Sequence, residues 1–149
     1  MTRSTAARPS DVWGVLADGW LYATWVVGAS RVREVDAAWP ATGSRIHHSF
    51  GAWPAVIDDE TVVLDAVPEQ SLVLRPRGWP AGEAVVDLRI VEADDGCELT
   101  IVEDAVAGPG ALVPKALRQR LIAVRNTEAL RRLTLVAEGR RRERSVAGE

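Results

Sequence analysis

The sequence predicts an α+β protein in which a curved antiparallel β-sheet wraps around one long C-terminal α-helix. Between Ser30 and about Ala105, apolar and polar residues alternate and are interrupted at intervals by Gly, Pro or Asp, as in strands joined by hairpins. From Lys115 to about Glu138 the apolar residues recur with helical spacing instead. Because one long helix must cover one sheet, we expect the sheet to curve and to leave a cavity beside the helix.

The residues before the sheet predict one short strand and two short helices. Met1–Ala7 has room for the strand, and Ser10 is a suitable N-cap for a helix that stops at Asp18-Gly19. A second short helix is expected over Trp20–Val27, where Gly28 ends it.

Six strands are expected to follow as an antiparallel meander, because they are adjacent in sequence and their links are short. Their ranges are Arg31–Asp36, Ser44–Trp53, Thr61–Val67, Ser71–Arg75, Ala84–Ala93 and Cys97–Ala105. Since neighbouring side chains on a strand point to opposite faces, His48 and Glu103 fall on the apolar, inward faces of their strands. His47 falls on the outward face.

On the long C-terminal helix, one apolar face is formed by Leu117, Leu121, Val124 and Leu135, and it is flanked by Ile122, Leu133 and Val136. Glu128 projects from the middle of this face. A lone buried charge is costly, so Glu128 is expected either to pair with an arginine or to line the cavity.

Length and composition fit a single domain over residues 1–139, followed by a disordered tail rich in Arg and Glu over residues 140–149. A net charge of −3 argues against a nucleic-acid partner, since phosphate binding normally needs a basic face. Cys97 is the single cysteine, and no apolar run is long enough to cross a membrane or to serve as a signal peptide. We therefore expect a cytoplasmic protein without a membrane span. Oligomeric state does not follow from the sequence.

Aromatic residues are concentrated in the first third of the chain, where five of the six tryptophans lie before Pro54. Large aromatic side chains bury roughly 150–250 Å² each, and an apolar cavity lined by them is the usual form of a small-molecule site. The alternative is that they only fill the core. The candidate ligand-binding residues are Trp20, Tyr22, Trp25, Phe50, Trp53, Trp79, Leu121, Val124 and Glu128.

Three segments resemble a known superfamily. One is similar to a strand end and opening helix: Ala6-Ala7-Arg8-Pro9-Ser10-Asp11-Val12-Trp13-Gly14-Val15-Leu16-Ala17-Asp18. The second, carried by Trp20, Tyr22, Trp25 and Val26, is similar to a short second helix, and the third, Gly43-Ser44-Arg45, to a turn into a cavity strand. Together they resemble the START / Bet v 1-like (SRPBCC) superfamily, in particular its bacterial polyketide cyclase/dehydrase-like branch. The resemblance implies a helix-grip fold with a pocket for an apolar or aromatic molecule, and it does not imply one reaction. The leading strand is unusually short for that pattern.

His48 and Glu103 are the candidate catalytic residues, because both are expected to face the cavity from separate strands. A histidine titrates near neutral pH, and an apolar cavity disfavours the charged carboxylate, so the pair suits acid/base chemistry. The alternative is structural: Glu103 pairs with an arginine such as Arg125, and His48 caps a buried polar group. No metal site is expected, since His47 and His48 face opposite sides of their strand, and no cofactor motif is present.

The expected function is binding of a small hydrophobic molecule, such as a polyketide, lipid or aromatic metabolite, between the sheet and the C-terminal helix. One alternative is a cyclase or dehydratase that uses His48 and Glu103 in the same cavity. Another is a protein-interaction module that uses exposed tryptophans and the arginine-rich helix.

Overall fold

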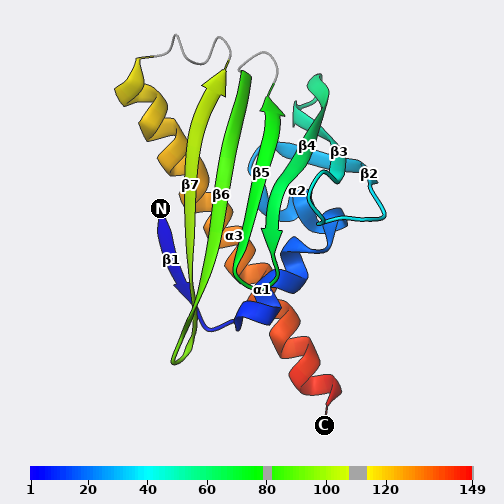
Figure 1. Cartoon of the computed structure of the whole chain (residues 1–149), viewed down its shortest axis with the longest axis vertical. Coiled ribbons are helices and arrows are strands. Elements are labelled where there is room, and N and C mark those ends of the chain that lie inside the picture. Colours follow the sequence, from blue (N-terminus) through cyan, green and yellow to red (C-terminus); the bar gives the residue numbers. More distant parts are fainter. Residues whose placement is uncertain (79–81, 108–113, 149) are drawn as a thin grey trace.

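The computed structural model describes residues 1–78, 82–107 and 114–148, and within them seven strands form one antiparallel sheet (Figure 1). The strand order is β1-β7-β6-β5-β4-β3-β2, so the meander is continuous and β1 is added at its far edge. The strands are β1 (Thr2–Thr5), β2 (Ala29–Val35), β3 (Arg45–Ala52), β4 (Ala55–Val67), β5 (Ser71–Gly78), β6 (Gly82–Ala93) and β7 (Gly96–Ala107).

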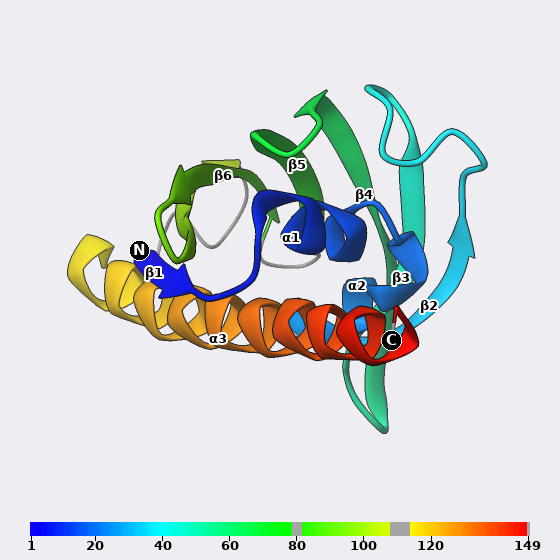
Figure 2. The same ribbon diagram turned by 90° about the horizontal axis from the view of Figure 1, so that it is seen from below.

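The helices lie on one face of this sheet. They are α1 (Pro9–Leu16), the 3₁₀ turn η1 (Gly19–Leu21), α2 (Tyr22–Trp25) and α3 (Lys115–Ala147). Figure 2 shows α3 running along the inner side of the curved sheet, with α1 beside its C-terminal half. The predicted helix-grip arrangement is confirmed. None of the helices in the described ranges is both long enough and apolar enough to cross a membrane.

The core joins the sheet to the middle of α3. Leu88 of β6, Leu99 of β7 and Leu130 and Leu133 of α3 are all buried in one apolar cluster. Burying a side chain of this size stabilises the fold by about 1.5–3 kcal/mol relative to leaving it exposed. The alternation predicted for β6 and β7 is therefore confirmed at these core positions.

The buried face of α3 differs from the predicted one. Asn126, Ala129, Leu130, Leu133 and Ala137 are buried. The side chains predicted to share the sheet-facing stripe, Leu117, Leu121, Val124 and Leu135, are instead exposed. Apolar spacing alone could not choose between these two stripes, because each carries aliphatic residues at helical intervals.

The C-terminal end of α3 corrects a second prediction, since the helix continues to Ala147 where a disordered tail was expected over residues 140–149. Arg140 donates hydrogen bonds to the Gly14 carbonyl (2.9 Å) and to Asp18 Oδ2 (2.8 Å). Arg144 forms an ion pair with the buried Asp11. These partly exposed arginines connect the C-terminal end of α3 to α1 and to Asp18 through hydrogen bonds and ion pairs.

Two boundaries near the cavity also differ from the sequence prediction. The second helix covers only Tyr22–Trp25, because the backbone becomes extended at Val26 and the β-branched Val26 and Val27 lead into β2. Strand β4 begins at Ala55 rather than Thr61, because its backbone already pairs with β3 from Ala55 onward. Within this extension, Ser49 Oγ donates a 2.6 Å hydrogen bond to the Asp58 carboxylate.

Candidate functional site

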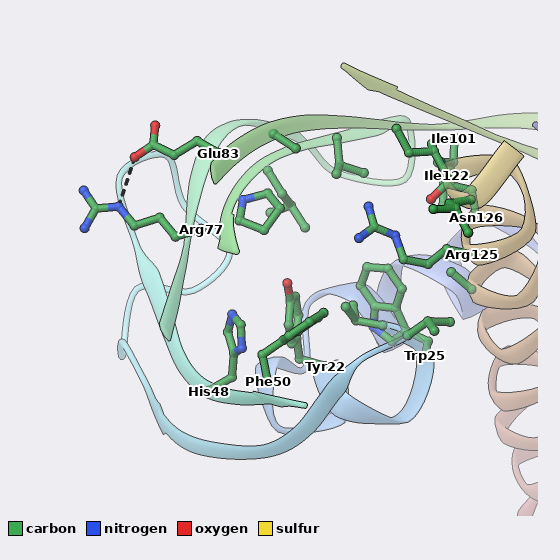
Figure 3. A pocket seen from close by; sticks show the side chains of 18 of the residues that line it. Tyr22, Trp25, His48, Phe50, Arg77, Glu83, Ile101, Ile122, Arg125 and Asn126 are labelled. Atoms are coloured by element: carbon green, nitrogen blue, oxygen red, sulfur yellow. Dashed lines mark hydrogen bonds and ion pairs between the residues drawn. The ribbon is translucent and has the colours of Figure 1, made fainter. Parts of the chain in front are cut away.

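A cavity of about 350 Å³ lies between the concave face of the sheet and the N-terminal half of α3 (Figure 3). Most of its wall is aliphatic or aromatic. The lining residues are Tyr22, Trp25, Val26, Val27, His48, Phe50, Leu74, Pro76, Arg77, Gly82, Glu83, Ala84, Val86, Ile101, Arg118, Leu121, Ile122, Arg125, Asn126 and Ala129.

Three aromatic side chains form one side of this cavity. Tyr22 and Trp25 of α2 pack edge to face, with ring centroids 5.6 Å apart, and Phe50 comes from β3. Gly28 leaves room for the Phe50 ring: its backbone has a positive φ of 99°, and a Cβ atom there would lie 2.2 Å from that ring. Only glycine allows both this backbone conformation and the close approach of the ring.

A short hydrogen-bond chain lies on the same side of the cavity. The Tyr22 hydroxyl is 2.8 Å from Thr61 Oγ1, and His48 Nε2 is 3.0 Å from the same oxygen. The rings of Tyr22 and His48 lie 5.1 Å apart, centroid to centroid. All three side chains are buried, so the chain links α2, β3 and β4 beneath the aromatic wall.

Burial sets the protonation of this chain. It raises the pKa of Tyr22 to about 12 because the charged phenolate is poorly solvated there, so the phenol remains neutral across the physiological range. Burial also lowers the pKa of His48, since the protonated imidazolium is disfavoured for the same reason. Two neutral groups that can donate and accept hydrogen bonds therefore stand at the cavity wall.

The helix side of the cavity carries a charged and an amide group. Arg125 of α3 points into the cavity (Figure 3) and forms an ion pair with Glu103 of β7, whose side chain is 4% exposed. The second carboxylate oxygen of Glu103 is buried and has no hydrogen-bond partner in the described part of the chain. The buried Asn126 lies on the next position of the helix and also lines the cavity.

The rim of the cavity is formed by an ion-pair network on β4, β5 and β6. Arg77 Nε lies 3.2 Å from Glu83 Oε1, and Arg77 Nη1 lies 3.4 Å from Glu60 Oε1. Figure 3 shows the Arg77–Glu83 pair at the far end from Trp25 and Arg125. Polar groups thus border an interior that is otherwise apolar.

The structure brings several of the predicted site residues together. Tyr22, Trp25, Phe50, Leu121 and His48 line the cavity. Glu103 does not line the cavity, but it forms an ion pair with Arg125, which does. His48 is hydrogen-bonded to Thr61. Both contacts correspond to the structural alternative considered for this pair.

Other predicted ligand-binding residues lie outside this cavity. Trp20 is 61% exposed, Trp53 89% and Val124 71%, and none of the three lines the cavity. Glu128 is held at the surface by Arg131 (2.7 Å) and Arg132 (2.8 Å), which lower its pKa to about 2. The position of Trp79 lies outside the described residues.

The sequence did not identify Thr61 or Asn126 as part of the site. Thr61 lies two residues beyond Asp59, which faces His48 in the β3–β4 register, so its place beside His48 depends on strand pairing. Asn126 could have been found as a neutral polar residue at helical spacing from Ala129, Leu130 and Leu133. Within the described ranges, no group of His, Cys, Asp and Glu side chains is placed to hold a metal ion.

Solved structures share this arrangement at low sequence identity. Protein NE0264 from Nitrosomonas europaea superposes with a TM-score of 0.73 and 15% identity, covering 95% of this chain and 94% of that one. Ara h 8.0201 gives a TM-score of 0.69 with 10% identity and coverages of 93% and 95%. The di-domain ARO/CYC protein StfQ from the steffimycin biosynthetic pathway gives 0.72 with 13% identity, where 94% of this chain covers 50% of that one. The fold is that of the START / Bet v 1-like superfamily, as the sequence predicted.

Within this superfamily, the family is given by a sequence model that spans residues 6–137. That model is described as Activator of Hsp90 ATPase homolog 1-like protein, and the chain belongs to this family. No curated protein matches the chain.

Proposed function

We propose that this protein binds a small hydrophobic or aromatic molecule in the cavity between the sheet and α3. The observation that carries the proposal is an apolar cavity of about 350 Å³ that retains a few polar groups. Cavities of roughly 300–1,000 Å³ with this composition are typical of small-molecule sites. Tyr22, His48 and Arg125 reach the cavity from three different elements, which is how a ligand is oriented within an apolar wall.

The aromatic wall favours a flat, ring-containing ligand over an alkyl chain. Rings bound against Tyr22, Trp25 and Phe50 gain edge-to-face or offset contacts in addition to burial. Two structural neighbours support the same class: StfQ belongs to the steffimycin biosynthetic pathway, and DynU16 is described as a putative protein in the dynemicin biosynthetic locus. We therefore place a polyketide-like or other aromatic metabolite ahead of a lipid.

Filling the cavity tests this proposal. Ala129 is buried and lines the cavity, whereas Thr127 is exposed on the same helix. Ala129→Trp should weaken binding of the apolar dye Nile red, followed by its fluorescence, by at least about tenfold. Thr127→Trp adds the same side chain outside the cavity and should bind the dye as the wild-type protein does. Equal binding by both variants, or no saturable binding by the wild type, would contradict the proposal.

A second candidate function is cyclisation or dehydration of a carbonyl compound in the same cavity. Its support is His48, whose lowered pKa leaves a neutral imidazole able to accept a proton. Glu103 was the proposed partner, and its ion pair with Arg125 makes it a positioning group for that guanidinium. If the enzyme hypothesis is correct, His48→Ala and Glu103→Gln remove turnover of a polyketide-like substrate and leave ligand affinity nearly intact. Full turnover in both variants would refute it.

A protein-interaction function is favoured by the family description, which names activation of the Hsp90 ATPase. The exposed Leu117 and Val124 on α3 offer an apolar surface for such a contact. Replacing both with arginine should abolish stimulation of a purified Hsp90-type ATPase without changing dye binding. Absence of stimulation by the wild-type protein would exclude this function.

A further inference from the structure

The second ring nitrogen of His48, Nδ1, determines the direction of the hydrogen bonds in the Tyr22–Thr61–His48 chain. Nδ1 of His48 is buried and makes no hydrogen bond of normal geometry among the described residues, although the Ser49 backbone acts on the ring and raises its pKa against the larger effect of burial. A buried N–H without an acceptor is among the rarest defects in folded proteins, whereas an unused lone pair is tolerated more often. Burial keeps the His48 ring neutral, with one proton to place. That proton therefore belongs on Nε2.

The rest of the chain follows from counting protons. With its proton on Nε2, His48 donates to Thr61 Oγ1 at 3.0 Å. The Thr61 hydroxyl has a single proton of its own, and its remaining partner in the described structure is the Tyr22 oxygen at 2.8 Å. Thr61 thus donates to Tyr22. The phenolic proton of Tyr22 is then left without an acceptor among the residues that the structure describes.

The free phenolic proton is available to the cavity. Figure 3 shows the Tyr22 hydroxyl directed into the space enclosed by the lining side chains. The phenol remains protonated because its pKa is raised to about 12, so it acts as a donor rather than as a charge. Arg125, which also lines the cavity, is close enough to act electrostatically on this hydroxyl. A positive charge beside a donor favours an electron-rich oxygen at that point.

We propose that Tyr22 is the specificity-determining hydrogen-bond donor of the cavity and that the ligand is an aromatic molecule with an acceptor oxygen, such as a ring ketone, bound to its hydroxyl. The proposal rests on the proposed ligand-binding function and narrows it. A hydrocarbon of the same shape leaves the buried phenolic proton unpaired, and a site of this kind discriminates against such a ligand.

The direction of the chain is tested first, on the protein without ligand. The protein has two histidines, so His47→Gln leaves His48 as the one imidazole to observe. Two-bond nitrogen–proton correlation spectra distinguish the ring tautomers, and we expect the proton on Nε2. A proton on Nδ1 reverses the chain, makes the Tyr22 oxygen an acceptor and overturns the proposal.

The ligand class is tested with two three-ring compounds, fluorenone and fluorene, which differ by a carbonyl in place of a methylene. Calorimetric titration should show wild-type protein binding fluorenone about tenfold more tightly than fluorene, the ratio for one hydrogen bond to an otherwise unpaired donor. Tyr22→Phe keeps the ring and removes the hydroxyl, so it should bind the two compounds equally. The infrared carbonyl stretch of bound fluorenone should lie at lower frequency in wild type than in Tyr22→Phe.

The outcomes separate this inference from the function on which it rests. Binding of both compounds with equal affinity by the wild type supports a hydrophobic site but overturns the role of Tyr22. A ketone preference that survives Tyr22→Phe assigns the donor to another group, such as Arg125 or Asn126, and overturns it as well. If neither compound binds, the proposed function fails and the inference fails with it.

Discussion

The two halves of α3 face the rest of the protein in opposite ways. In the C-terminal half, Leu130, Leu133 and Ala137 are buried, Arg144 pairs with Asp11 of α1, and Arg140 pairs with Asp18 just beyond α1. In the N-terminal half, Leu121 and Ile122 border a cavity, and Leu121 remains 61% exposed. One helix therefore closes the core at one end and leaves it hollow at the other.

The two halves of α3 therefore contribute to different properties, the C-terminal half to stability and the N-terminal half to the cavity. The C-terminal, closed half stabilises the fold through apolar burial and charge-assisted contacts. Around the open, N-terminal half of α3, Glu103 Oε2 of β7 and His48 Nδ1 of β3 are buried polar atoms that make no hydrogen bond within the described part of the chain. Unpaired buried polar groups cost about 1–3 kcal/mol each, so the closed half must offset what the open half loses.

Truncating one leucine in each half gives the largest expected difference. Leu133→Ala should lower the free energy of unfolding by about 2–5 kcal/mol, because Leu133 is fully buried and a cavity would remain. Leu121→Ala should change it by less than about 0.5 kcal/mol, because that side chain already borders open space. Chemical denaturation measures both values. Similar losses for the two variants would show that α3 packs uniformly and would contradict the comparison.

Adding a methyl group at Gly28 should have a smaller effect on stability and a clear effect on binding. Gly28→Ala combines backbone strain at φ 99° with a clash against Phe50, so a loss of about 1–3 kcal/mol is expected together with weaker dye binding. Gly43→Ala is the matched control: its φ is 86°, but nothing lies within 4 Å of the added atom. It should share the strain and retain binding. If Gly28→Ala binds the dye as well as Gly43→Ala does, Phe50 is not held by this contact.

Most of the fold could be predicted from local patterns in the sequence. Alternation identified the strands and directed His48 inward, and His48 is 2% exposed. The helical spacing after Lys115 identified α3. Both patterns depend on neighbouring residues alone, so they survive without knowledge of the tertiary structure.

The errors lie where contacts between distant segments decide the outcome. The stripe of α3 that is buried depends on contacts with distant segments, such as Leu130 with the apolar cluster of the sheet and Arg140 with Asp18, 122 positions away in the chain, which no local period reveals. Thr61 joins the site through the register of β3 and β4. Trp20 and Trp53 are of a residue type that often lines ligand sites, but they lie on exposed turns outside the cavity. Residue type alone does not specify whether a side chain on a turn points toward the cavity or toward solvent.

The smallest expected effect is the change in the free energy of unfolding with pH that comes from His48, beside the open half of α3. Burial lowers the pKa of His48 in the folded protein below its ordinary value of about 6.5, and nearby Asp59 opposes this shift. The unfolded chain therefore binds a proton more readily than the folded protein does. The contribution of neutral His48 to the free energy of unfolding is complete above about pH 6.5 and is lost as the pH falls through the lower pKa of the folded state.

His48→Gln should remove this loss, which urea denaturation at a series of pH values between about 5 and 8 would measure. A ligand that fills the cavity should steepen the loss, because it further desolvates the ring. An unchanged pH profile in His48→Gln would show that the open half contributes nothing to acid sensitivity and that other groups, such as those of the closed half, account for it.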